Sequence, residues 1–142
     1  MSDASRYFYK NVYTLEVDLH HIFGNAVIGA TGSIANSSIK GGGITGIVRN
    51  SAGNYTISYG PKFNRFIGGQ FGFLHTAIGT VAIVQVIGTP ATFQADVKAS
   101  KSITIQCIDY AGLAVDPDNG SVLTFRMDFR LSSIGKYDVG HL

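Results

Sequence analysis

The last long hydrophobic segment of the chain, residues 121–131, alternates between apolar and polar side chains. Every second residue is apolar, namely Leu123, Phe125, Met127, Phe129 and Leu131. The residues between them are polar, namely Thr124, Arg126, Asp128 and Arg130. Successive side chains of a β-strand point to opposite faces. The pattern therefore predicts one strand with an apolar face in the core and a polar face that points outward or into an interface.

Further segments with strand character recur along the chain at spacings of about ten residues. The predicted strands are residues 13–23, 26–34, 44–49, 54–59, 66–74, 80–87, 92–97, 102–109 and 121–131. Turn-forming residues separate them, among them Gly24-Asn25, Gly60-Pro61 and residues 116–120. No segment combines a sustained 3.6-residue period with a helix cap. The sequence predicts an all-β fold, either an antiparallel sandwich or a Greek-key or jelly-roll-like barrel of about eight strands.

Two of the predicted strands depart from simple alternation. Residues 66–74 include Gly68, Gly69 and Gly72, and glycine inside a strand is typical of a bulge or a bend. Residues 80–87 are apolar on both phases of the strand. That pattern predicts burial on both faces, either inside the fold or beneath another chain.

The chain has 142 residues, the size of one domain with a substantial hydrophobic core. We expect residues 1–12 to form an N-terminal arm and residues 13–142 to form a single β-domain. The arm contains three consecutive aromatic residues, Tyr7, Phe8 and Tyr9. They either dock on the core of their own domain or pack on a neighbouring subunit, where aromatic side chains contribute strongly to binding.

Composition narrows the classes of function. The net charge is only +2, and the basic residues are dispersed, which argues against nucleic-acid binding. There is neither a signal-peptide pattern nor an apolar run of about 18 residues, so we expect a soluble protein made in a cytosol, without a membrane partner. Only 14% of residues are charged and 45% are apolar, which indicates more apolar surface than one core requires.

Few residues indicate chemistry, and each group has a simpler interpretation. Glu16 and Asp18 share one strand face about 7 Å apart, which resembles the carboxylate pair of a glycosidase, but nothing else indicates a sugar cleft. Residues 116–120 resemble the start of a calcium loop and are equally explained as a turn. The glycines of residues 41–46 lack the lysine of a phosphate loop. Cys107 fits a buried small hydrophobe. We expect no enzymatic activity, metal or cofactor.

Residues from about 42 to 133 carry a resemblance to a known group of proteins. The first part has a Gly43-Ile44 start, Arg49, a Gly-x-Tyr hairpin at residues 53–55 and a Lys-aromatic-Asn-Arg element at residues 62–65. The later part has an alternating strand, the sequence Ala-Val-Asp-Pro-Asp-Asn-Gly at residues 114–120, and a long final strand. Together these features resemble small virion proteins of tailed bacteriophages.

The resemblance implies a structural role without catalysis. The role that best fits is a capsid decoration, or cement, protein on the capsid surface of the virion, made in the host cytoplasm. Its partners would be the major capsid protein, whose subunits it bridges and stabilises, and sister copies, with a homotrimer expected at local threefold axes. The residues expected at interfaces are Tyr7, Phe8, Tyr9, Arg65, Arg126 and Arg130. The alternative is a receptor- or glycan-binding module of a tail or fibre.

Overall fold

The computed structural model of the protein describes residues 19–130. Within this range lie seven strands and one α-helix. The strands are β1 (Leu19–Val27), β2 (Ile44–Ser51), β3 (Asn54–Tyr59), β4 (Arg65–Leu74), β5 (Ile83–Ile87), β6 (Ser102–Ile108) and β7 (Val122–Arg130). The helix is α2 (Phe93–Ser100), and two short 3-10 turns, η1 (Ala30–Gly32) and η2 (Asn36–Ser38), follow β1.

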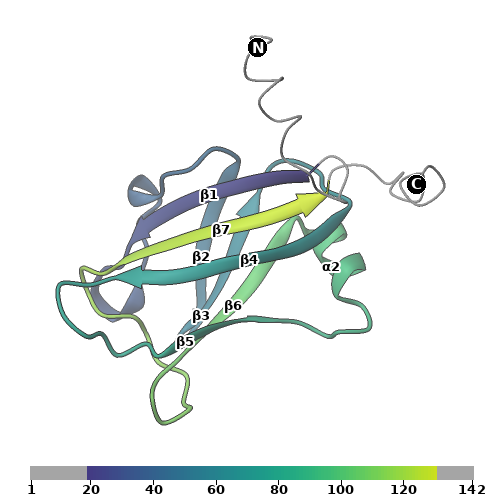
Figure 1. The fold of residues 1–142 in the computed structure, drawn as a ribbon. Coiled ribbons are helices and arrows are strands. Elements are labelled where there is room, and N and C mark those ends of the chain that lie inside the picture. The colour runs from purple at the N-terminus through teal and green to yellow at the C-terminus, as the bar shows by residue number, and fades with distance from the viewer. Residues whose placement is uncertain (1–18, 131–142) are drawn as a thin grey trace, which may run out of the picture.

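The strands form two antiparallel sheets that pack face to face. One sheet has three strands in the order β1-β7-β4, and the other has four in the order β2-β3-β6-β5. In Figure 1, β7 lies between β1 and β4 in one layer, and the four-stranded sheet forms the layer beneath it. The predicted all-β sandwich is therefore confirmed. No helix within residues 19–130 is long and apolar enough to cross a membrane.

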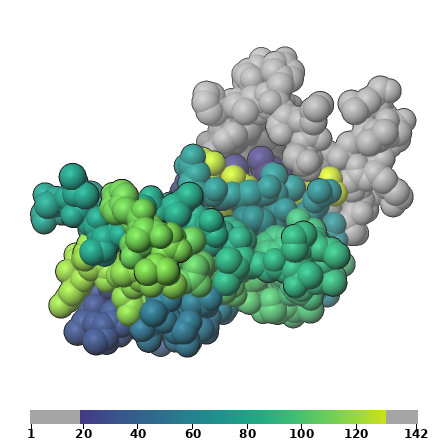
Figure 2. Space-filling model, turned by 90° about the horizontal axis from the view of Figure 1, so that it is seen from below, coloured from purple at the N-terminus to yellow at the C-terminus, as the bar shows by residue number. Residues whose placement is uncertain are grey.

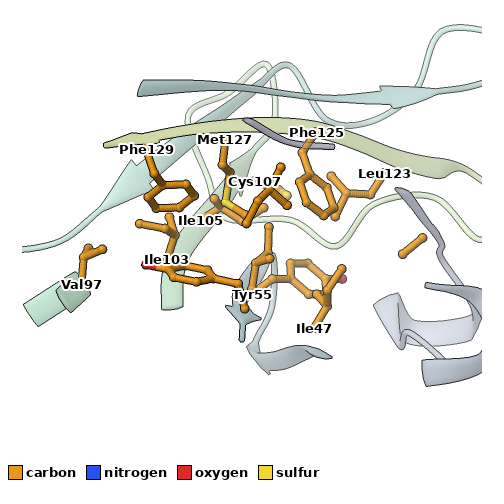
Figure 3. Close-up of a cluster of buried hydrophobic side chains, with 14 of the residues drawn as sticks. Ile47, Tyr55, Val97, Ile103, Ile105, Cys107, Leu123, Phe125, Met127 and Phe129 are labelled. Carbon is orange, nitrogen blue, oxygen red and sulfur yellow. The ribbon is translucent and has the colours of Figure 1, made fainter. Parts of the chain in front are cut away.

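The core lies between the two sheets and follows the predicted alternation. The apolar residues of β7 are buried, with exposed fractions of 0% for Leu123, 5% for Phe125, 0% for Met127 and 0% for Phe129. Ile103, Ile105 and Cys107 of β6 face them from the other sheet (Figure 3). The predicted phase of this strand is thus confirmed. Leu131 lies outside the described residues.

An aromatic cluster fills one end of the core around Phe129. The ring of Phe63 is stacked on Phe129 with a centroid distance of 4.3 Å and an interplanar angle of 8°. The rings of Tyr59 and Phe66 contact Phe129 at 4.8 Å and 5.5 Å. Tilted and edge contacts of this kind add stability beyond the area that they bury.

One predicted strand is a helix. The prediction of a strand at residues 92–97 is wrong, because Phe93–Ser100 forms α2. The Thr92 hydroxyl donates a hydrogen bond to Asp96, and the backbone N–H of Asp96 donates to the Thr92 carbonyl, at 2.8 Å and 2.9 Å. Only Val97 is fully buried in this helix. A helix of eight residues with one buried position is too short to show a 3.6-residue period of apolar side chains in the sequence.

The first described strand also differs from the prediction. The composition of Gly24-Asn25 predicts a turn, but β1 runs through both residues. A Cβ on Gly24 would lie 2.4 Å from the Phe125 ring, so glycine at this position makes room for a core side chain. The predicted strand at residues 26–34 is also wrong beyond Val27, because the chain turns at Thr31 and Gly32, with φ of 55° and 74°.

The two predicted strands that depart from simple alternation, residues 66–74 and 80–87, differ in how well the prediction fits the structure. The glycine-rich strand β4 has a register shift between Phe66 and Gly68, which confirms the predicted bulge. The strand β5 is at the edge of its sheet, and Ile83 is 53% exposed. Burial of residues 80–87 on both faces inside this fold is therefore wrong. Burial beneath another chain stays a prediction.

A salt bridge joins the β6–β7 loop to the β2–β3 hairpin. The Arg49 guanidinium donates two hydrogen bonds to the Asp116 carboxylate, at 2.9 Å and 2.8 Å, and the Gly53 N–H donates a third at 2.8 Å. These bonds favour the charged form and lower the pKa of Asp116. Beneath them, the Tyr55 hydroxyl donates to the Gly32 carbonyl at 2.6 Å. The network fixes the loop and turn at one end of the sandwich.

Candidate interaction surface

The outward side of the β1-β7-β4 sheet, called the outer face below, is crossed by rows of residues that strand register places side by side. From one end to the other the rows are Leu19/Arg130/Arg65, His21/Asp128/Gly68, Phe23/Arg126/Gln70, Asn25/Thr124/Gly72 and Val27/Val122/Leu74. Because β7 buries the alternate residues in the core, the residues in these rows point away from it.

One end of the outer face is basic. Arg65 and Arg130 are directly opposite each other on β4 and β7, and Arg126 lies further along β7. Asp128 is the acidic residue of these rows, with its Oδ1 2.5 Å from His21 Nδ1 and 3.3 Å from Arg126 Nε. Among the described residues, these rows contain three arginines and one aspartate, so basic side chains predominate in them. Arginine guanidinium groups form strong paired hydrogen bonds with carboxylates, so an acidic partner surface would complement this end of the face.

The opposite end of the outer face is apolar. Val27 is 45% exposed and Leu74 is 65% exposed, and both lie in the last row beside Val122. Phe23, two rows away, is 62% exposed. Scattered apolar residues are common on protein surfaces, but Val27, Val122 and Leu74 form one contiguous row, and contiguous exposed apolar groups are typical of interaction sites.

A shallow hollow of about 720 Å³ lies across the middle of the outer face. Phe23, Asn25, Gln70 and Arg126 are among the residues that surround it. Part of this hollow lies over Gly72 of β4, where no side chain fills the space. A Cβ built on Gly72 would have no atom within 4 Å. Glycine in an outward position thus leaves open space where most strands would carry a side chain.

The loops after β4 and β6 expose further apolar residues. Figure 2 shows these loops projecting at one end of the molecule. Ile78 is 91% exposed and Tyr110 is 74% exposed. The two loops are joined by Asp118, which accepts hydrogen bonds from the Thr80 N–H and hydroxyl at 2.9 Å and 3.0 Å.

The remaining candidates for chemistry have structural partners or are buried. Asp116 binds Arg49 and Asp118 binds Thr80, so the two carboxylates of the calcium-like turn do not converge on one site. Burial raises the pKa of the Cys107 thiol to about 12, which keeps it protonated at neutral pH. Within residues 19–130, no group of three His, Cys, Asp or Glu side chains could hold a metal ion. Glu16 and Asp18 lie outside the described residues.

The structure brings together part of the predicted interface set. Arg65, Arg126 and Arg130 all lie on the outer face. Tyr7, Phe8 and Tyr9 lie outside the described residues. Phe23 is a further residue of this surface that the sequence prediction does not include. It belongs to the predicted strand at residues 13–23, but that prediction does not say to which face of the strand its side chain points. The signal was available, because Phe23 shares its strand phase with His21 and Asn25, whereas Ile22 and Ala26 occupy the apolar phase and are buried.

Fold and surface together define a small all-β sandwich protein with a broad outer face that is basic at one end and apolar at the other. Comparison of the chain with protein-family models, with curated protein sequences and with solved structures finds no match. The resemblance to phage virion proteins therefore rests on sequence motifs alone.

Proposed function

We propose that this chain is a structural protein of a tailed-phage virion, a capsid decoration protein that binds and bridges major capsid protein subunits. The observation that carries the proposal is the outer face, on which Arg65 and Arg130 form a basic row at one end and Val27 and Leu74 an apolar row at the other. The sequence resemblance supplies the choice of partner, and the role needs no catalytic residue.

The composition of the outer face suits protein docking. Arginine and aromatic residues are enriched at protein interfaces, whereas lysine is depleted. The rows of the outer face contain three arginines, exposed Phe23 and no lysine. A β-sheet is also rigid, so little conformational entropy is lost when it binds. Many copies of one modest contact, repeated by the symmetry of a shell, would together stabilise that shell.

The proposal places this protein on the capsid surface, in contact with the major capsid protein and with sister copies. Quantitative mass spectrometry of purified virions whose genome encodes the chain tests it. We expect a copy number comparable with that of the major capsid protein. Absence from the particles, or only a few copies per virion, would refute a decoration role.

A binding experiment tests the outer face directly. Purified protein is added to virions that lack it because its gene has been deleted, and bound protein is measured after sedimentation. We expect the double substitution Arg65→Glu with Arg130→Glu to weaken binding by at least about tenfold, because it places like charges against an acidic partner. Lys101→Glu, which reverses an exposed charge beside the other sheet, is the matched control and should bind like the wild type.

The hollow favours a second candidate function, glycan or receptor binding as part of a tail or fibre. An exposed aromatic ring, Phe23, borders the amide side chains of Asn25 and Gln70 around a concave site, and such a combination suits small polar ligands. Binding to host cells or to a glycan array that Phe23→Ala abolishes would support this function. Equal binding by Phe23→Ala would exclude the hollow as the site.

A further inference from the structure

The edges of the two sheets differ in how they are protected. An edge strand exposes unpaired backbone N–H and C=O groups, and proteins usually cover or distort such edges because they pair readily with other strands. The two sheets have four edge strands, which are β1, β4, β2 and β5. Three of these edges carry recognisable protection.

Loop groups cover the edge of β1. The backbone N–H and C=O of Asn25 pair with those of Lys40, both at 2.8 Å. The Val27 N–H donates to the Ser38 hydroxyl at 3.3 Å. These contacts occupy outward backbone groups in the last three residues of β1, so regular pairing with a new strand is interrupted there.

The edges of β4 and β2 are interrupted by other means. On β4, the side-chain amide of Gln94 accepts from the Phe66 N–H at 2.9 Å and donates to the Phe66 carbonyl at 3.0 Å. The bulge in β4 follows at once. On β2, register shifts interrupt the ladder near both ends of the strand, and such shifts bend an edge away from regular pairing.

The edge of β5 has none of these devices within the described range. Its five residues pair with β6 without a register shift, and residues 79–89 contain no charge and no proline. The Lys101 carbonyl, just before β6, accepts a hydrogen bond from the Tyr59 N–H of β3, and the Cys107 N–H of β6 donates to the Gly53 carbonyl just before β3. In this register the odd-numbered residues of β6 make their backbone hydrogen bonds with β3. The even-numbered residues therefore pair with Ile83, Gln85 and Ile87. This leaves the backbone groups of Val84 and Val86 directed outward along the edge.

The side of the sandwich next to β5 is also incompletely covered. Two hollows of about 280 Å³ and 290 Å³ lie along it. One includes Phe73 and Val84 in its lining, and the other includes Val86 and Phe93. All four side chains are only partly buried although they pack on the core. An additional strand at this edge would extend the cover over them.

The sequence of β5, Ile-Val-Gln-Val-Ile, reads the same in both directions. If two copies pair antiparallel about a two-fold axis at Gln85, each Gln85 lies opposite the other. Val84 then meets Val86 of the second copy, and Ile83 meets Ile87, so every residue is opposite its own kind on the same face. The outward backbone groups of Val84 and Val86 form the hydrogen-bonded pairs in this register, and the two Gln85 residues form a close pair with Cα atoms about 4.5 Å apart.

We propose that β5 is a self-association edge, through which two copies of this chain form a two-fold dimer with one continuous antiparallel sheet. The contact is isologous, since each copy supplies the same strand. The proposal does not depend on a capsid role. It differs from the trimer expected from the sequence, and the mass of the protein in solution separates the two.

The first test measures mass by sedimentation velocity on the 142-residue chain of 15.1 kDa. We expect a dimer for the wild type. Gln85→Lys and Gln85→Glu should each raise the dissociation constant by at least about tenfold, because like charges face each other across the axis. A mixture of the two variants should dimerise again, since lysine then faces glutamate. Val48→Lys, at an exposed position on the opposite edge strand of the same sheet, is the control and should remain dimeric.

The second test detects a dimer even if it dissociates readily. Gln85→Cys should form a disulfide between copies under mild oxidation, because close antiparallel pairs have suitable geometry. Val48→Cys should not, and native Cys107 is fully buried. A monomeric or trimeric wild type whose Gln85→Cys variant does not cross-link would overturn the proposal. So would Gln85→Lys and Gln85→Glu variants that dimerise like the wild type.

Discussion

Replacing Phe129 with alanine tests the centre of the aromatic cluster and with it the packing of the two sheets. Phe129 is 0% exposed. Its ring is stacked on Phe63 at 4.3 Å and is in contact with Tyr59 and Phe66. Truncation leaves a cavity that these three rings cannot all close, because each is held by a different strand or loop.

The expected cost follows from burial and from the ring contacts. Truncating a buried phenylalanine to alanine lowers the free energy of unfolding by about 3–5 kcal/mol, and each aromatic pair is worth about 0.5–1.5 kcal/mol beyond its buried area. With three ring partners, Phe129→Ala belongs at the upper end, about 4–5 kcal/mol. Phe125, which packs on Gly24 and lies 6.3 Å from the Phe71 ring, has fewer partners, so Phe125→Ala should cost about 3–4 kcal/mol.

Urea denaturation gives the measurement. The chain has seven tyrosines and no tryptophan, so tyrosine fluorescence and far-UV circular dichroism report unfolding. Phe23→Ala is the control, because its ring is 62% exposed, and it should change the free energy of unfolding by less than about 0.5 kcal/mol. A cost below about 1 kcal/mol for Phe129→Ala would show that the inward phase of β7 is misassigned.

Three further predictions concern single residues. Asp116→Asn should lower the free energy of unfolding by about 1–2 kcal/mol at neutral pH. This cost is smaller than that of breaking a buried ion pair, because solvent screens the partly exposed Arg49–Asp116 pair. Hydrogen bonding to Arg49 lowers the pKa of Asp116 below its ordinary 3.8. The wild-type advantage should therefore be complete above that value and disappear as the pH falls through the lowered pKa; a pH-independent difference contradicts this. Gly24→Ala should cost about 1–3 kcal/mol, because its Cβ would meet the Phe125 ring, and unchanged stability in urea would contradict the close packing. Cys107, whose pKa burial raises to about 12, should react with a thiol reagent only on unfolding, and rapid labelling of the native protein would count against its burial.

The strands that could be predicted from the sequence are those whose two faces lie in different environments. In β3, β6 and β7 one face lies in the core and the other does not, so buried and less buried residues alternate along each strand. This alternation is a local property of the chain. It predicts both the strand and its direction.

Other elements depend on contacts that the local sequence does not display. Gly24-Asn25 has the composition of a turn but lies within β1, because Phe125, about a hundred residues later, needs the space above Gly24. The helix α2 has Val97 as its one fully buried residue, so its period was not visible. The apolar residues on both phases of β5 predict burial on both faces, but the structure places this strand at a sheet edge, which its local sequence does not display.

The interface residues illustrate the same limit. The phase of β7 predicts that Arg126 and Arg130 point outward. That Arg65 lies opposite Arg130 depends on the register between β4 and β7, and the bulge after Phe66 shifts that register by one residue. Phase can be predicted from the sequence, whereas the juxtaposition of distant strands requires the structure.

The two proposed contacts use different sheets and are compatible with each other. A two-fold axis perpendicular to the β2-β3-β6-β5 sheet at the β5 edge would leave the β1-β7-β4 sheets of both copies on the same side of the joined sheet. Both outer faces would then point in one direction and could bind one shell at the same time, which raises affinity without any new contact. Gln85→Lys should therefore weaken attachment to virions while each outer face remains intact. The double substitution Arg65→Glu with Arg130→Glu should weaken attachment by at least about tenfold without changing the mass of the dimer. Because the two sets of variants separate docking from self-association, failure of one proposal would leave the other standing.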